Sequence, residues 1–115
     1  MSLQQAGLAP RLVIDCSHGN SSKDYKRQPL VAQDIARQIA AGSHGICGVM
    51  LESHLVAGRQ DIVDGLTGLT YGQSVTDGCI NWDSTVEVVG ELAQAVDARR
   101  RLTGRTGLFR KAGTF

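Results

Sequence analysis

The chain has 115 residues, of which 42% are hydrophobic and 20% charged, with 12 Lys and Arg against 11 Asp and Glu. This balance suits a single soluble domain. It excludes a disordered chain and a protein whose overall charge attracts nucleic acid. No apolar run approaches the roughly 18 residues that a membrane span needs, and the first residues lack the hydrophobic core of a signal peptide. We therefore expect a cytoplasmic protein that contacts no membrane.

The three cysteines, Cys16, Cys47 and Cys79, form no CxxC pair. An odd number without such a pair favours neither a disulfide framework nor a zinc knuckle, so a reducing compartment fits the sequence. Cys47 lies inside an apolar run, and we expect its side chain to be packed in the core.

Two short apolar runs, 12–14 and 46–51, are typical of strands in a buried parallel sheet, because apolar and polar residues do not alternate in them. Between them, Pro29 opens a stretch whose apolar residues recur at helical spacing, and this helix should end near Gly42. A connection of about 30 residues between two strands is the length of a right-handed crossover. The sequence therefore predicts a strand, a helix and a second, parallel strand.

A long loop and a second helix follow. Ser84 and Glu87 have the spacing of a capping box, and Val89 and Leu92 continue an apolar stripe. The glycine-rich loop over 54–83 is unusually long for a compact domain, and such loops often belong to a functional site or need a neighbouring segment. Two parallel strands leave their edges unpaired. The sequence thus predicts an α/β unit that further strands complete.

Polar side chains follow both predicted strands. His18 comes shortly after the first run and Glu52 directly after the second, and neighbouring parallel strands end at the same edge of a sheet. The long loop can fold Asp77 over that edge. An imidazole with two carboxylates suits a divalent first-row ion such as Mn²⁺, Fe²⁺, Co²⁺ or Zn²⁺. On spacing alone an alternative stays open, in which these residues are ordinary loop residues that hydrogen-bond near the strand ends.

Three motifs together carry a resemblance to a known family. DCSHGNSSK at 15–23, GVMLESHL at 48–55 and YGQSVTDGCINW at 71–82 resemble the C-terminal part of type I 3-deoxy-D-arabino-heptulosonate 7-phosphate (DAHP) synthase. The likeness runs from about Pro10 to Arg101, with the motifs in the family's order. It implies a (β/α)₈ TIM-type barrel, of which this chain supplies the last two βα units and is incomplete as a single chain.

The resemblance also implies an activity, the condensation of phosphoenolpyruvate with erythrose 4-phosphate at the first step of the shikimate pathway of aromatic amino acid biosynthesis. Members of the family hold a divalent metal with a cysteine, a histidine, a glutamate and an aspartate, and the last three correspond to His18, Glu52 and Asp77. The cysteine and the basic residues that bind both substrate phosphates belong to earlier strands, which this chain lacks. We therefore expect three metal ligands here, assign no other catalytic or substrate-binding residue, and expect no activity from the chain alone.

Several neighbouring residues have two interpretations. Cys16 and Cys79 lie near the expected ligands in the sequence, and in the less favoured interpretation one of them replaces the family's missing cysteine ligand. Lys23 and the basic residues after it either meet a phosphate or are solvated, and we favour solvation. His54 either orients Glu52 as a hydrogen-bond donor or is satisfied by backbone, and the sequence does not decide between these.

We expect a lead-in over 1–10, the barrel segment over 11–101, and a basic, flexible tail over 102–115. The expected partners are the missing barrel portion or further copies of the chain, with phosphoenolpyruvate and erythrose 4-phosphate bound in the complete enzyme. The main alternative is a non-catalytic barrel fragment that acts only by self-association or by pairing with a partner. A nucleic-acid-binding module, based on the basic tail, is the least favoured hypothesis.

Overall fold

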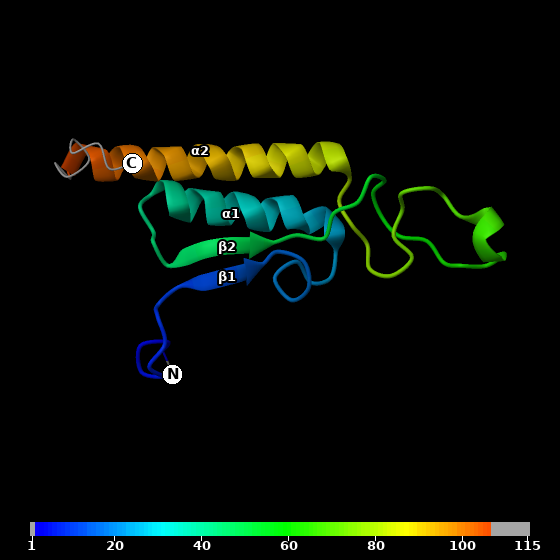
Figure 1. Cartoon of the computed structure of the whole chain (residues 1–115), viewed down its shortest axis with the longest axis horizontal. Coiled ribbons are helices and arrows are strands. Elements are labelled where there is room, and N and C mark those ends of the chain that lie inside the picture. Colours follow the sequence, from blue (N-terminus) through cyan, green and yellow to red (C-terminus); the bar gives the residue numbers. More distant parts are fainter. Residues whose placement is uncertain (1, 107–115) are drawn as a thin grey trace.

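The computed structural model describes residues 2–106, with side chains to residue 103 (Figure 1). The elements are β1 (Leu12–Asp15), η1 (Tyr25–Arg27), α1 (Gln28–Ala40), β2 (Ile46–Met50), η2 (Gly65–Gly68) and α2 (Trp82–Thr106). Helix α1 packs between α2 and the two-stranded sheet, and the loop between β2 and α2 extends beyond the end of the sheet (Figure 1). Within residues 2–106, no helix combines the length and hydropathy that crossing a membrane requires.

The two strands pair in parallel, as the sequence predicts. The register joins Leu12 to Ile46 and Asp15 to Met50, with an irregularity after Leu12. Helix α1 forms the crossover between them and ends at Ala40, close to Gly42, which adopts a φ of +112°. Both strands therefore end at the same edge of the sheet, and the α/β class is confirmed.

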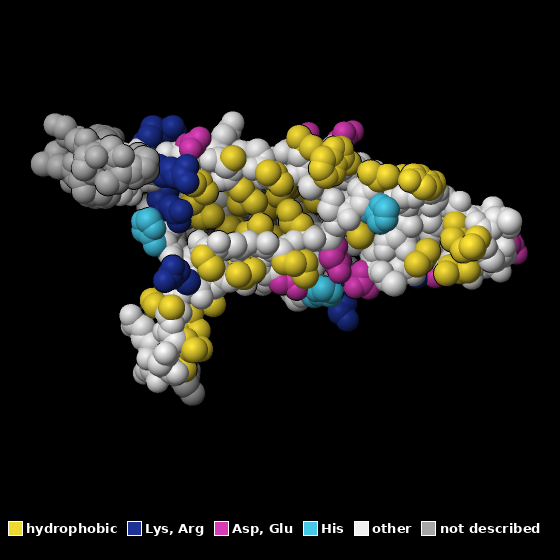
Figure 2. Space-filling view, in the orientation of Figure 1, with side chains coloured by type: hydrophobic (Ala, Val, Ile, Leu, Met, Phe, Trp, Pro, Cys, Tyr) yellow, Lys and Arg dark blue, Asp and Glu magenta, His cyan; other side chains and the backbone are white. Residues whose placement is uncertain are grey.

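The core lies between the two helices and one face of the sheet. Its buried members are mostly small or β-branched, which lets α1 approach α2 closely; they are Cys16, Ala32, Ile35, Ile39, Val88 and Ala95. On the sheet, Val13 is 65% exposed and Met50 38% exposed. Figure 2 shows hydrophobic side chains at the surface along the strands and over the protruding loop.

Cys47 is exposed, so the prediction that it lies in the core is wrong. The apolar run around Cys47 suggested a strand covered on both faces. The strand register passes over Cys47, since Leu12 pairs with Ile46 and Val13 with Gly48. Its thiol lies 3.5 Å from the carbonyl oxygen of Leu12.

The second predicted helix exists, but the predicted cap is wrong. Helix α2 begins at Trp82, and the side-chain oxygen of Asn81 accepts a hydrogen bond of 2.8 Å from the backbone N–H of Ser84. Asparagine is as good a capping residue as serine, so the earlier Asn81 takes the capping position and places Ser84 inside the first turn.

Helix α2 continues through the arginine-rich segment. Arg99 donates a 3.0 Å hydrogen bond from Nη1 to the carbonyl oxygen of Ser43, which ties α2 to the turn before β2. Residues 102–106, which the sequence analysis assigned to a flexible tail, continue α2. The rest of that expected tail, 107–115, lies outside the described residues.

The long loop is organised by its own hydrogen bonds. The Gln60 side chain donates to the carbonyl oxygens of Thr70 and Gln73 at 2.8 and 3.0 Å, and accepts from the backbone N–H of Thr70 at 2.8 Å. An antiparallel bridge joins Gly58 to Cys79. These contacts bring the segment that carries Asp77 back beside the end of β2.

Thiol labelling tests the placement of the three cysteines. Cys16 and Cys79 are 0% and 8% exposed, and burial raises the pKa of both thiols, so both should resist alkylation in the folded protein. Cys47 should react first. A brief N-ethylmaleimide pulse followed by peptide mass spectrometry should find the adduct on Cys47, and denaturant should release the other two. Equal labelling of all three before unfolding would contradict this packing.

Candidate metal centre

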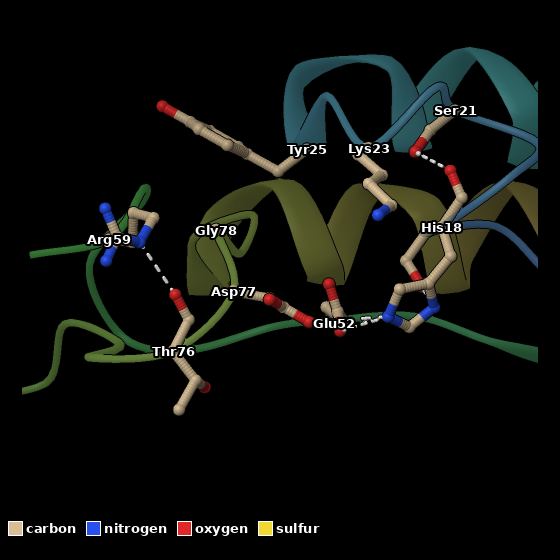
Figure 3. A pocket seen from close by; sticks show the side chains of 10 residues that line it. His18, Ser21, Lys23, Tyr25, Glu52, Arg59, Thr76, Asp77 and Gly78 are labelled. Atoms are coloured by element: carbon tan, nitrogen blue, oxygen red, sulfur yellow. Dashed lines mark hydrogen bonds and ion pairs between the residues drawn. The ribbon is translucent and has the colours of Figure 1, made fainter.

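Three polar side chains from separate segments meet at the carboxyl edge of the sheet. His18 Nε2 lies 3.2 Å from Glu52 Oε1 and 3.4 Å from Asp77 Oδ2 (Figure 3). One potential ligand atom from each residue lies within 4.8 Å of the others. The structure therefore brings together all three residues that the sequence analysis singled out.

His18 is oriented by Asp15, the last residue of β1. Its Nδ1 lies 2.8 Å from Asp15 Oδ2, and a carboxylate accepts hydrogen bonds, so Nδ1 donates and Nε2 faces the other two residues. Ser17 in turn donates from its backbone N–H to Asp15 Oδ1 at 2.8 Å, and its hydroxyl contacts the same oxygen. Asp15 therefore fixes both the tautomer and the direction of the imidazole ring.

Glu52 is positioned through its backbone by Gln28, the first residue of α1. Gln28 is fully buried, donates from Nε2 to the Glu52 carbonyl oxygen at 3.0 Å, and accepts from the Glu52 N–H at 2.9 Å. This reciprocal pair satisfies both backbone groups just beyond β2. It joins the beginning of α1 to the residue that carries the carboxylate.

Asp77 is held by the returning loop. Ile80 donates from its N–H to the Glu52 carbonyl oxygen at 3.0 Å, and Arg59 Nε donates to the Thr76 carbonyl oxygen at 2.7 Å. The Asp77 side chain itself is 64% exposed. Its position near His18 therefore depends on the backbone on either side of it.

Asp15 and Gln28 are functional residues that the sequence did not predict. Asp15 lies in the first motif, and a carboxylate shortly before a histidine at a strand end is a signal that could have been used. Gln28 gives no such signal, because its partner is remote in the sequence and a glutamine at the beginning of a helix is usually exposed.

The electrostatics of the site centre on the imidazole. Hydrogen bonding to Asp15, then to Asp77, and the negative charge of Glu52 raise the pKa of His18. Hydrogen bonds from Ser17 and His18 hold the pKa of Asp15 well below its usual range, while burial raises the pKa of Glu52. Negative charge thus surrounds one ring nitrogen, where a proton and a metal cation would compete.

The three residues form one side of a cavity of about 220 Å³, and Lys23, Tyr25 and Arg59 contribute to the rest of its wall (Figure 3). The ammonium group of Lys23 points toward the carboxylates (Figure 3). Lys23 is exposed to solvent, in agreement with the favoured interpretation, and it also lines the cavity.

The contacts of His54, Cys16 and Cys79 bear on the other open interpretations. Nδ1 of His54 accepts a 2.8 Å hydrogen bond from the backbone N–H of Leu55, so His54 is satisfied by backbone. Cys16 belongs to the core, and the Cys79 thiol lies 3.5 Å from the carbonyl oxygen of Asp77. Neither thiol is part of the group of potential ligands found among the described residues.

Replacing Asp15 tests its orienting role. Asp15→Asn removes the charge that orients the imidazole. Loss of a residue that hydrogen-bonds to a metal ligand typically weakens metal binding by about 10–100-fold. Titration with Co²⁺, followed by visible absorption, should show this loss. The matched control is Asp34→Asn, an exposed carboxylate that pairs with Arg37 at 3.2 Å and should leave the affinity unchanged. Equal Co²⁺ affinity of the Asp15→Asn and unmodified proteins would refute the role.

Comparison with known proteins agrees with the motifs. The family model described as the DAHP synthetase I family matches residues 1–89. Phospho-2-dehydro-3-deoxyheptonate aldolase of Haemophilus influenzae is 52% identical over 101 residues, which are 88% of this chain and 28% of that protein. The Tyr-sensitive enzyme of the same name from Escherichia coli is 46% identical over 103 residues, covering 90% of this chain and 28% of that protein.

A solved structure shows the same similarity to this family. The phospho-2-dehydro-3-deoxyheptonate aldolase of Francisella tularensis SCHU S4 superimposes with a TM-score of 0.78 at 50% identity, over 84% of this chain and 28% of that one. The chain therefore spans less than a third of the length of the relatives it matches. With half of its aligned residues identical and most of its length matched, the chain belongs to the DAHP synthetase I family.

Proposed function

We propose that this chain supplies the metal-binding part of a DAHP synthase, which condenses phosphoenolpyruvate with erythrose 4-phosphate and releases phosphate. The observation that carries this proposal is the convergence of His18, Glu52 and Asp77 at the carboxyl edge of two parallel strands. The names of the relatives support the reaction, because each is called a phospho-2-dehydro-3-deoxyheptonate aldolase.

The proposal includes the finer architecture, in which the chain forms the last two βα units of a (β/α)₈ barrel. Two features support it. The strands are parallel with a helical crossover, and the helices cover one face only. The other face exposes Val13 and Met50, and neighbouring barrel strands would cover such a face and pair with the open edges of β1 and β2.

The donor set fits a divalent first-row ion. One imidazole nitrogen and two carboxylate oxygens, with ligand atoms within 4.8 Å of one another, suit Mn²⁺, Fe²⁺, Co²⁺ or Zn²⁺ better than Ca²⁺ or Mg²⁺, which prefer oxygen ligands alone. His18, Glu52 and Asp77 would hold the ion. A cysteine from an earlier strand, implied by the resemblance, would complete the set.

When bound, the ion would supply Lewis-acid polarisation of the aldehyde oxygen and orient the reactants. The chain's own residues prepare the cavity for this. Asp15 keeps the proton on His18 Nδ1, so that Nε2 stays available, and Gln28 fixes the backbone of Glu52. Lys23 places a positive charge beside the carboxylates, where an anionic group of a substrate would enter.

A second candidate function is a non-catalytic fragment that associates with itself or with another barrel segment. The exposure of Val13, at 65%, and of Leu12, at 47%, on the strands favours this alternative. The two candidates differ in chemistry: the synthase proposal requires the cluster to act on substrates, whereas the alternative requires only the open sheet.

A chimera tests the synthase proposal. In it, the Haemophilus influenzae relative carries residues 10–101 of this chain in place of its own matching segment. We expect phosphate release from phosphoenolpyruvate plus erythrose 4-phosphate that a chelator abolishes. His18→Ala should lower this rate by more than the roughly 10–100-fold that loss of an outer-sphere partner costs, because it removes a ligand. His44→Ala, at an exposed position, is the control and should keep the rate.

Two outcomes would count against the proposal. The first is a chimera that has the mass and circular dichroism spectrum of the relative and binds metal, but releases no phosphate. This result would contradict the synthase function. Phosphate release that withstands chelator would instead contradict the metal role of the three residues.

A further inference from the structure

Tyr25, on η1, packs against the loop that carries Asp77. A Cβ atom built on Gly78 would lie 2.7 Å from Tyr25 Cδ1 and 3.4 Å from its Cε1 and Cγ atoms. A Cβ built on Gly58 would lie 3.4 Å from the Tyr25 hydroxyl oxygen. The ring therefore lies directly on the backbone at Gly78, and the hydroxyl end of the same side chain lies over Gly58.

These two glycines belong to the part of the loop that positions Asp77. Gly78 follows Asp77 in the chain. Gly58 donates to the Cys79 carbonyl oxygen at 2.8 Å and accepts from the Cys79 N–H at 3.2 Å, which forms the antiparallel bridge of the loop. The Tyr25 side chain thus reaches both backbone segments of this bridge, with its ring over the segment that follows the exposed carboxylate.

The ring is itself held in place. The Asp24 side chain accepts a 3.0 Å hydrogen bond from the Lys26 N–H, which caps η1, and the Lys26 ammonium lies 5.9 Å from the centroid of the Tyr25 ring. Helix α1 follows at once with Gln28, which fixes Glu52. One short segment, 24–28, therefore contacts the backbone of both carboxylate-bearing segments.

We propose that Tyr25 is a positioning residue for the candidate metal centre, and that its ring holds the 77–79 backbone so that the Asp77 carboxylate reaches His18 and Glu52. This inference rests on the proposed metal role of those three residues. Ring carbons make the contacts at Gly78, next to Asp77, so the aromatic ring rather than the hydroxyl group carries the effect on the carboxylate.

Co²⁺ titration of four proteins tests the proposal: the unmodified chain, Tyr25→Ala, Tyr25→Phe and Tyr71→Ala. Tyr25→Ala should weaken Co²⁺ binding by about 10–100-fold, as expected when a ligand loses its support. Tyr25→Phe should restore the affinity. Tyr71 lies on the same loop and is 90% exposed, so Tyr71→Ala should change the affinity by no more than about twofold. Unchanged affinity in Tyr25→Ala would overturn the proposal.

A double-mutant cycle separates positioning from a general loss of structure. If Tyr25 acts through Asp77, then adding Tyr25→Ala to Asp77→Asn should cost no further affinity, because the group it positions is already gone. An equal loss in both backgrounds would show that Tyr25 supports the whole domain and would refute the specific role. Where Tyr25→Ala fails to fold, Tyr25→Leu replaces it, with a smaller loss expected.

Hydrogen exchange gives a readout that needs no metal. The amides of Gly58 and Cys79 should exchange at least about tenfold faster in Tyr25→Ala, and at the unmodified rate in Tyr25→Phe, because the bridge opens without the ring. If the unmodified chain binds no Co²⁺, the proposed metal role fails, and exchange alone decides whether the ring holds the loop. Unchanged amide protection of Gly58 and Cys79 in Tyr25→Ala would refute the claim that the ring holds the loop.

Discussion

Strand direction determines where the candidate site lies. Because β1 and β2 run in parallel, with Asp15 opposite Met50 at the end of the register, the segments that leave both strands emerge at the same edge of the sheet. His18 follows one strand and Glu52 the other, so their proximity follows from the pairing. Antiparallel strands would place the two residues at opposite ends. The crossover helix α1, the covered face of the sheet and the returning loop all depend on this arrangement.

Around that edge, one imidazole is surrounded by three carboxylates. Asp15 accepts a hydrogen bond from Nδ1, while Glu52 and Asp77 face Nε2 at 3.2 and 3.4 Å. Such a concentration of negative charge is costly unless a cation compensates it, and the partial burial of Glu52, which raises its pKa, adds to that cost. A divalent ion would satisfy both carboxylates at once, which supports the proposed metal centre on grounds of charge as well as geometry.

The sequence predicted what local patterns encode. Unbroken apolar runs predicted the strands and their parallel pairing, helical spacing predicted α1, and polar residues after each strand predicted the cluster. Contacts between remote residues left no such pattern, so the pairing of Gln28 with Glu52 was missed. Cys47 was wrongly placed in the core, because its run of residues cannot show that the strand register passes over this position. The cap of α2 was misplaced because Asn81 and Ser84 are both good capping residues.

The central claim is that His18, Glu52 and Asp77 bind a divalent ion. Equilibrium dialysis of the purified chain against Mn²⁺ or Co²⁺, with the bound metal measured by atomic absorption, tests this directly. The account predicts a single ion bound per chain, lost in His18→Ala and retained in His44→Ala, whose exposed imidazole lies in the turn before β2. Absence of stoichiometric binding, or equal binding by His18→Ala, would contradict it.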